Sequence, residues 1–346
     1  MRNILCVTLI ALLGGCTSTS VTEKYQDKRN DIINVKDKVI EFETGNVLIG
    51  SVSRLYMSNK CLLIADHKSV DKQIHIFNKN DFSYLTSIGN FGEGPEEITV
   101  MGCLAIDEAH HQLYVSDHAK QKIFSYDMDS VMVDSLYKPQ VKTAMNETLF
   151  PSEYQYINDT LSIAVLIKPT STSTFNQFLG RWNMNTGEMI PMKYTHPDIQ
   201  KKRITFAASE KAGIYVECYT RHDLMTICSL DGELLYNIYG PDWDGGNGNK
   251  LQSFGTVMIG NDKIFVSYCG EDYARDSFPT KILVFDLEGN YLKTLETGYK
   301  ISDCCYDSFN NRIILSLNDV VQFAYLDIDG IISVSYTHLR AHETEA

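Results

Sequence analysis

Residues 284–289 read Val284-Phe285-Asp286-Leu287-Glu288-Gly289, which is the end of an apolar β-strand followed by an acidic turn. Asp, Asn and Gly tolerate the left-handed backbone that tight hairpins need, so this pattern predicts a hairpin between two strands. Five other passages repeat the pattern, at residues 76–81, 125–130, 181–187, 227–232 and 325–330. The copies recur at intervals of roughly 40–57 residues, which is the period of a propeller blade. The sequence therefore predicts an all-β fold, a six-bladed β-propeller.

Each copy expands into a unit of four short antiparallel strands in which apolar and polar residues alternate. The clearest strands are predicted at 103–106, 112–116, 122–126 and 131–133 and, in the fifth copy, at 256–259, 263–267, 281–285 and 291–295. Four-stranded blades arranged radially bury their faces against their neighbours. The last copy has too little sequence for its fourth strand, whereas the strand at 38–42 has no blade of its own. We therefore expect this N-terminal strand to pair with the last blade and close the ring.

The N-terminus has the features of a secretory leader. Met1-Arg2-Asn3 is basic, residues 4–13 are apolar, and Gly14-Gly15-Cys16 follows. This order is typical of a signal peptide, and the apolar run is too short for a permanent membrane span. The stretch ending at Cys16 resembles the lipobox of bacterial lipoproteins, which implies a signal peptide at 1–15 and a lipid on Cys16. A plain signal peptide with an unrelated cysteine is the alternative.

Residues 16–34 are polar, which predicts a flexible tether between a lipid anchor and a propeller at 35–333. Thr17 follows the cysteine in place of the Asp that favours inner-membrane retention in well-studied envelopes, so we expect anchoring in the outer membrane. No acidic run of the kind linked to surface export follows Cys16. The predicted location is therefore the cell envelope, on the periplasmic face of the outer membrane.

Residues 334–346 continue neither the strand pattern nor the composition of the chain before them. They are similar to the translation of a common sequencing-library adapter, so we interpret them as a non-native tail. A genuine polar C-terminal tail is the alternative. Amplification of the locus from source DNA decides between the two, because a native gene that encodes the tail would contradict the adapter interpretation.

The chain is acidic, with 44 Asp and Glu against 31 Lys and Arg and a formal net charge of −13. Nucleic-acid binding requires clustered Lys and Arg, so nucleic acid is not a predicted partner. Of nine cysteines, Cys6 and Cys16 lie in or next to the leader, and the other seven leave at least one free thiol. Most of the seven lie in apolar strands as small buried side chains, but Cys218 and Cys228 flank a hairpin and could form a disulfide. No spacing matches a zinc site, and the identity of any cofactor is left open.

Residues 89–129 carry a signature that begins with Gly89 and Phe91-Gly92-Glu93-Gly94-Pro95-Glu96-Glu97 and continues through strands at 104–107, 113–117 and 122–127. The signature resembles an NHL-type propeller repeat and, more closely, the six-bladed TolB-like propeller lipoproteins of Bacteroidetes. This resemblance extends over about residues 35–330 and implies the same fold and an envelope location. It implies no single function, because related propellers include scaffolds, binding proteins, lyases and calcium-dependent esterases.

Asp66-His67 and Asp117-His118 occupy equivalent places at the ends of the second strands of adjacent blades. An Asp–His pair can orient a general base. The repetition favours a structural interpretation instead, in which each carboxylate accepts backbone N–H bonds from the following turn. Neighbouring residues of a strand point to opposite faces, so neither imidazole is expected to lie against its own Asp.

The loops that differ between the repeats are the candidate binding sites, because loops on a rigid scaffold are where function concentrates. We expect an exposed tryptophan, whose ring suits contact with a sugar or a peptide. The predicted ligand-binding residues, expected to gather on one rim of the propeller, are Trp243, Tyr273, Arg275, Arg221 and His222. Simple length variation of solvent loops is the alternative.

The sequence contains no nucleophile elbow, no phosphate loop and no zinc-protease motif. We therefore predict a lipid-anchored binding module whose partner is a protein, a peptide or a glycan, and we assign no catalytic or metal-binding residue. The alternative is a metal-dependent hydrolase or lyase with acidic ligands around the propeller channel. Stoichiometric calcium that survives dialysis would favour the enzyme.

Overall fold

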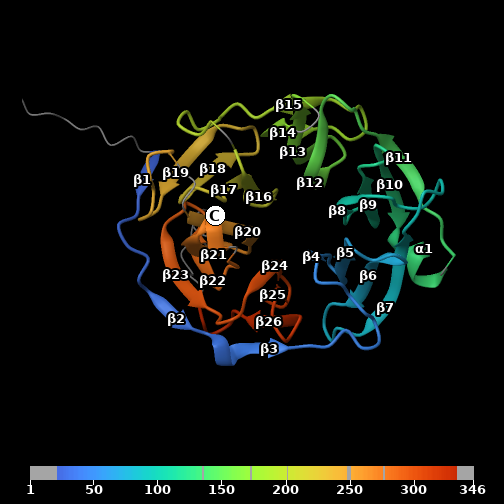
Figure 1. Ribbon diagram of the computed structural model, residues 1–346, viewed down its shortest axis with the longest axis horizontal. Helices are drawn as coiled ribbons and strands as arrows, with labels where there is room; N and C mark the ends of the chain where they lie inside the picture. Colours follow the sequence, from blue (N-terminus) through green and yellow to red (C-terminus); the bar gives the residue numbers. More distant parts are fainter. Residues whose placement is uncertain are drawn as a thin grey trace, which may run out of the picture.

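Six β-sheets form a ring in the computed structural model of the protein, which Figure 1 shows from one end. The structure describes residues 22–332 apart from 135, 172–173, 201, 248–250 and 276. The predicted signal peptide at 1–15, Cys16 and the predicted tail at 334–346 therefore lie outside the described residues.

The first three blades, from inner to outer strand, are β4 (Ser53–Met57), β5 (Cys61–Asp66), β6 (Lys72–Asn78) and β7 (Tyr84–Asn90); β8 (Met101–Asp107), β9 (Gln112–Asp117), β10 (Lys122–Asp127) and β11 (Gln140–Ala144); and β12 (Phe150–Asn158), β13 (Leu161–Pro169), β14 (Phe175–Trp182) and β15 (Met189–Pro191).

The other three blades continue the same order around the ring. They are β16 (Ile204–Ser209), β17 (Ile214–Tyr219), β18 (Leu224–Ser229) and β19 (Leu234–Tyr239); β20 (Leu251–Gly260), β21 (Lys263–Asp272), β22 (Lys281–Asp286) and β23 (Tyr291–Glu296); and β24 (Ile301–Asp307), β25 (Arg312–Leu317), β26 (Phe323–Asp327) and β3 (Val39–Glu41). The predicted six-bladed, four-stranded antiparallel architecture is confirmed. The repeated acidic turn also has the left-handed backbone that its residues favour, since Gly289 has a φ of 79° in the hairpin between β22 and β23.

The ring closes through the N-terminal strand, as predicted. β3 pairs antiparallel with β26, with Ile40 opposite Tyr325. The backbone N–H of Phe42 donates to the carbonyl of Phe323, and the Phe42 ring stacks on Phe82 of blade 1 at 3.8 Å between centroids. One short strand therefore joins the last blade to the first and leaves the last blade with four strands.

Residues 22–41, here called the N-terminal belt, run along the outside of three blades (Figure 1). β1 (Glu23–Tyr25) adds a parallel fifth strand to β19, and β2 (Ile32–Asn34) adds one to β23. A 3-10 turn at Lys36–Lys38 then leads into β3. The predicted flexible tether at 16–34 is therefore wrong for residues 22–34, because their backbone groups pair with the outer edges of two blades.

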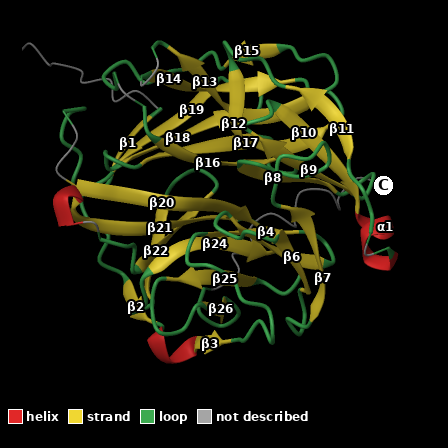
Figure 2. Cartoon of the chain, turned by 45° about the vertical axis from the view of Figure 1, so that its right-hand side comes forward, coloured by secondary structure: helices red, strands yellow, loops and turns green. Residues whose placement is uncertain are grey.

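Strands dominate the fold, and the few helical turns are short (Figure 2). The predicted strand at 131–133 is wrong: these residues belong to α1 (Met128–Val133), whose first turn is capped by the Asp127 side chain accepting from the backbone N–H of Ser130. The fourth strand of that blade is β11 instead. Within the described part of the chain, no helix is long and apolar enough to cross a membrane.

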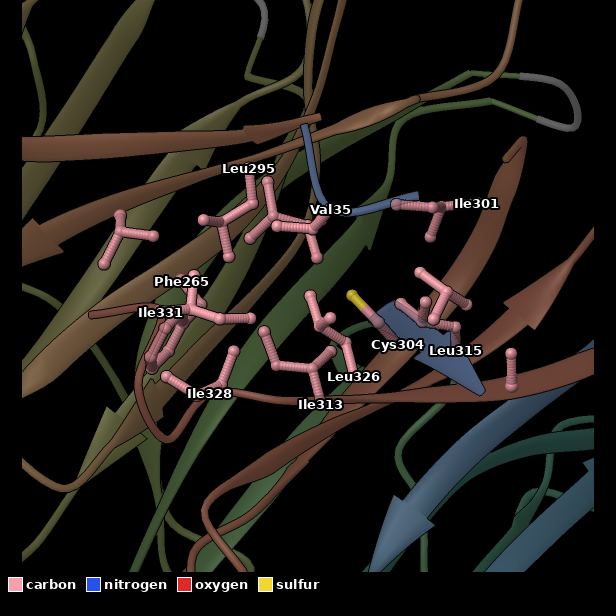
Figure 3. Packing of buried hydrophobic residues seen from close by; sticks show 14 of the residues in the cluster. Val35, Phe265, Leu295, Ile301, Cys304, Ile313, Leu315, Leu326, Ile328 and Ile331 are labelled. Carbon is pink, nitrogen blue, oxygen red and sulfur yellow. The ribbon is translucent and has the colours of Figure 1, made fainter. Parts of the chain in front are cut away.

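The core consists of apolar clusters between neighbouring blades. Figure 3 shows one of them, in which Val35 of the belt packs with Leu295, Ile313, Leu326 and other side chains of the last two blades. The seven cysteines of the described residues are buried and free. The possible disulfide between Cys218 and Cys228 does not form, because the register places Met225 opposite Cys218 and Tyr215 opposite Cys228.

Candidate functional site

A channel of about 1360 Å³ runs along the axis of the propeller. Its wall consists of the inner strands of all six blades, at residues 53–57, 101–106, 152–157, 204–208, 256–259 and 302–306. Each of these strands is the last in its sheet, so one edge of its backbone pairs with no strand of its own blade. Such edges offer free N–H and C=O groups, which makes the channel wall a hydrogen-bonding surface for a ligand.

Two acidic side chains of the channel follow β-bulges in the inner strands. In β12 the register shifts between Pro151 and Glu153, and in β24 it shifts between Ile301 and Asp303. A bulge inserts one unpaired residue and changes the direction in which the next side chains point. The two bulges thus place Glu153 and Asp303 on the channel wall, on strands of blades 3 and 6.

The central contact of the channel is an ion pair between blades 1 and 3. Arg54 Nη1 of β4 lies 2.8 Å from Glu153 Oε1 of β12, and the two side chains are 46% and 37% exposed. The pair therefore spans the width of blade 2, the blade between them. Burial of the guanidinium lowers the pKa of Arg54, but the combined effects of Glu153, Tyr56 and Asp303 outweigh burial and raise this pKa.

Asp303 is a second acid close enough to Arg54 to influence its pKa. Its Oδ2 accepts from the backbone N–H of Leu55 at 2.8 Å, and its Oδ1 accepts from the Thr256 hydroxyl at 2.7 Å. Burial raises the pKa of Asp303, against these hydrogen bonds. Both oxygens thus have partners in the wall, which leaves Glu153 as the acid that faces Arg54 directly.

The structural interpretation of the repeated Asp–His pairs is confirmed for the two carboxylates. Asp66 Oδ1 accepts from the backbone N–H of Lys68 at 2.9 Å, and Asp117 Oδ1 accepts from that of Ala119 at 3.0 Å, both in the following turn. The Oδ2 atoms accept from the backbone N–H groups of Gly50 at 2.7 Å and Thr99 at 2.8 Å. Each carboxylate thereby holds the connection that enters its blade against the end of the second strand. This contact is architecture, since a carboxylate at the end of the second strand holds the entering connection in both blades.

The imidazoles of His67 and His118 line the channel at the end where the inner strands begin. Burial lowers the pKa of both histidines, and the nearby Arg54 charge lowers that of His67 further. Both rings are therefore neutral near pH 7. Their Nε2 atoms are buried and have no hydrogen-bond partner within the described residues.

The predicted rim residues lie away from the channel wall. Trp243 is half-buried, so the predicted exposure is wrong: its ring packs against Tyr239 at 4.9 Å, His196 at 5.7 Å and His222 at 6.0 Å. The loop around Trp243 folds back onto blade 4, which buries an apolar ring that would otherwise face water.

The other predicted rim residues divide into two places. His222 is buried beside Trp243, and the charge of Arg221 influences its pKa, which burial lowers. Arg275 is exposed in the short helical turn Tyr273–Arg275 and lies 3.5 Å from Glu271. The side chain of Tyr273 is outside the described part of the structure. A ligand-binding role for these five residues stays a prediction.

One group of potential metal ligands occurs in the described residues, outside the channel. Ligand atoms of Asp107, His110 and Asp159 lie within 4.8 Å of one another. The Asp107 carboxylate already accepts from the backbone and the imidazole of His110 and from Tyr114. The carboxylate of Asp307, at the same place in blade 6, holds its turn in the same way through Asn310, which favours a turn cap over a metal site.

No motif or spacing in the sequence indicates Arg54, Glu153 or Asp303 as site residues. They occupy inner strands in which the side-chain direction depends on register, and a single inserted residue reverses that direction. The sequence shows His67 and His118 as a repeat, but only the arrangement of the blades in the ring shows that both line the same end of the channel. The one usable signal was that blades 1 and 2 carry His where the equivalent turns of blades 4 and 6 carry Thr220 and Asn318.

Comparisons with known proteins agree with this architecture. Residues 18–176 match the family model DUF5128, described as a 6-bladed beta-propeller. The chain is a six-bladed β-propeller. A Bacteroides fragilis protein described as exported is similar over 88% of this chain and 98% of its own, with a TM-score of 0.58 and 12% identity.

Two further solved structures show the same likeness at low identity. A member of the DUF4221 family from Bacteroides vulgatus has a TM-score of 0.55 and 11% identity, and the match covers 87% of this chain and 98% of that one. A luciferin-regenerating enzyme has a TM-score of 0.54 and 8% identity, and the match covers 83% of this chain and 94% of that enzyme. No curated protein matches the sequence. At these identities the similarity concerns the fold alone.

Proposed function

We propose that the protein is a lipid-anchored binding module of the cell envelope, which takes up part of a peptide, a glycan or an envelope protein in its axial channel. The observation that carries this proposal is the half-exposed Arg54–Glu153 pair inside a channel of about 1360 Å³. A volume of this size exceeds the roughly 300–1,000 Å³ of a typical small-molecule pocket. The free inner edges of the blades supply further hydrogen bonds.

The envelope location is supported by the leader at 1–15 with its lipobox-like end at Cys16, and by a structural relative described as exported. The resemblance to TolB-like and NHL-type lipoproteins of Bacteroidetes points the same way, to the periplasmic face of the outer membrane. Labelled palmitate should enter the expressed chain, and Cys16→Ser should abolish the labelling. Labelling that persists in the variant would contradict lipidation at this residue.

Narrowing the channel entrance tests the binding site itself. Val52 and Val100 line the entrance and are each 49% exposed, so Val52→Trp and Val100→Trp add bulk there without removing core contacts. Val70 lies in the same blade as Val52 but outside the channel lining and is 82% exposed, which makes Val70→Trp the matched control. We expect binding in glycan and peptide arrays to fall for the first two variants and to persist in the control. Ligands that ignore both entrance variants would contradict the channel as the site.

The rim at Trp243, Tyr273, Arg275, Arg221 and His222 is a second proposed contact surface. Ligands that bind normally to the entrance variants but lose affinity for Arg275→Ala would place binding at the rim. Arg275 is the informative position because it is exposed, whereas Trp243→Ala would also remove packing against blade 4.

A hydrolase or lyase in the same channel is the second candidate function. It is favoured by Glu153 next to two imidazoles that are neutral at pH 7, since neutral imidazole and carboxylate are the usual general bases. Turnover of a captured ligand by the wild type, lost in Glu153→Gln, would favour the enzyme. Unchanged ligand recovered after prolonged incubation would favour the binding module.

A further inference from the structure

The Arg54–Glu153 pair differs from the other ion pairs inside the described fold. Four pairs have both side chains at most 8% exposed: Arg29–Asp223, Lys79–Asp307, Arg312–Asp307 and Lys202–Glu217. The channel pair is 46% and 37% exposed, so it contributes about 1 kcal/mol or less to stability. A ligand can therefore separate its two partners at little cost to the fold.

The charges of the channel wall restrict which ligand can do so. The described lining carries two cations, Arg54 on an inner strand and the exposed Lys68 next to His67, and two acids, Glu153 and Asp303, on inner strands. A purely anionic ligand would pair with Arg54 but would meet both carboxyl groups. A purely cationic ligand would pair with Glu153 but would face the guanidinium. A ligand that carries both signs close together satisfies Arg54 and Glu153 at once and adds no net charge to the site.

The remaining polar groups fit such a ligand. The neutral imidazoles of His67 and His118 add hydrogen-bonding nitrogens without a charge, and their Nε2 atoms have no partner within the described residues. Asp303 is held by Leu55 and Thr256, so it fixes the wall and does not compete for the ligand's cation. Arg and Glu both have several rotatable bonds, which lets the pair open around a small group.

We propose that the Arg54–Glu153 pair binds a zwitterionic α-amino-acid group, with the ligand carboxylate on Arg54 and the ligand ammonium on Glu153. A guanidinium binds a carboxylate through two parallel N–H···O bonds, and the Glu153 carboxylate accepts from the ammonium. The four charges then alternate in sign around the site. This inference rests on the proposed function for the location of the site, which is the channel, and it names a smaller ligand, a free α-amino acid, in place of a segment of a peptide, glycan or protein.

Titration of the purified full chain with the common free L-amino acids, followed by calorimetry, identifies the best binder. Its N-acetyl derivative lacks the ammonium and its carboxamide lacks the carboxylate. Each derivative should bind about tenfold more weakly or worse, since a charge-assisted hydrogen bond contributes about 1.5–3 kcal/mol. A dipeptide, in which the two charges lie on different residues, should also bind more weakly. Derivatives that bind as tightly as the parent would overturn the inference.

Two variants assign the charges to their partners. In Arg54→Met the free amino acid and its carboxamide should bind alike, and in Glu153→Gln the free amino acid and its N-acetyl form should bind alike. These comparisons are made within one variant, so a change in folding affects both ligands equally. Variants that keep the wild-type discrimination would overturn the assignment.

The two proposals can fail separately. If no amino acid binds but a glycan or a peptide binds and is lost in Val52→Trp and Val100→Trp, the zwitterion inference is wrong and the channel function stands. If amino acids bind equally well to both entrance variants, the channel is not the site and both proposals are wrong. Binding that is lost in the entrance variants and kept in Val70→Trp supports both.

Discussion

At the scale of single residues, Arg29 is the side chain that fixes the belt to the ring. Its Nη1 lies 2.6 Å from the Asp223 carboxylate, and both side chains are inaccessible, at 6% and 0%. Arg29→Met would leave a buried carboxylate without its cation, which costs about 3–5 kcal/mol. We expect that loss in the free energy of unfolding measured with denaturant. Arg275→Met, which breaks the exposed pair with Glu271, is the control and should cost about 1 kcal/mol or less.

The pH dependence of the same variant tests whether the ion pair is the cause. Burial raises the pKa of Asp223, and Arg29 opposes that shift. A carboxyl whose folded pKa exceeds its unfolded value stabilises most below the unfolded pKa, and the contribution is lost as the pH rises through the folded pKa. Without Arg29 the upward shift is larger, so Arg29→Met should lose less stability at about pH 5 than at about pH 7. An equal loss at both pH values would contradict the pair as the cause.

Two histidines should have pKa values on opposite sides of the ordinary histidine pKa. Burial lowers the pKa of the channel residue His118, whereas the hydrogen bond to Asp107 raises that of His110. NMR titration of the imidazole signals should therefore place His118 below about 6.5 and His110 above it. The pKa of His118 is lower in the folded than in the unfolded chain, so the unfolded chain takes up the proton first. The folded state therefore loses stability as the pH falls below the unfolded pKa. The reverse order of the two values would contradict the burial of His118.

At the scale of elements, the closing strand β3 should have an energetic effect beyond its length. Phe42, directly after it, stacks on Phe82 of blade 1 and lies 5.9 Å from Phe323 of blade 6. Phe42→Ala should lower the free energy of unfolding by about 2–3 kcal/mol, below the range for a fully buried Phe because this ring is half-buried. Ile40→Ala, on the exposed side of β3, is the control, with a loss of about 1 kcal/mol or less. If Phe42→Ala and Ile40→Ala lose similar amounts of unfolding free energy, β3 acts as an ordinary edge strand and its contacts with blade 1 do not stabilise the closed ring.

The elements also show why prediction from the sequence succeeded for the fold and failed for the site. Turn chemistry is local, so the hairpin copies located the blades, and the unassigned strand at 38–42 located the closure. The direction of Glu153 and Asp303 depends on bulges, which come from pairing with residues about 13 positions further along the chain. The strand at 131–133 was wrong for a related reason, since the Asp127 cap starts a helical turn within an apolar stretch.

At the scale of the whole molecule, the described ring is complete by residue 332. Blade 6 has four strands through β3, and Ile331 and Ile332 pack in the last core cluster. A chain that ends after Ile332 should therefore keep the melting temperature of the full chain within error in differential scanning calorimetry. A chain that ends after Leu326 loses Ile328, Ile331 and Ile332 from that cluster and should melt lower. A large drop in the first truncation would contradict the interpretation of 334–346 as a non-native tail.

The belt has a consequence for the order in which the chain folds. Its strands pair with partners more than 200 residues away, in the last three blades. Contacts of such sequence separation form late and slow the folding of a domain. β1 and β2 gain their partners when blades 4 and 5 are synthesised, whereas β3 gains its partner only with blade 6, so the ring has open edges until then. Under the proposed export to the envelope, the ring can close only after blade 6 has crossed the membrane, so the time for which the open chain needs protection from aggregation depends on its last strand.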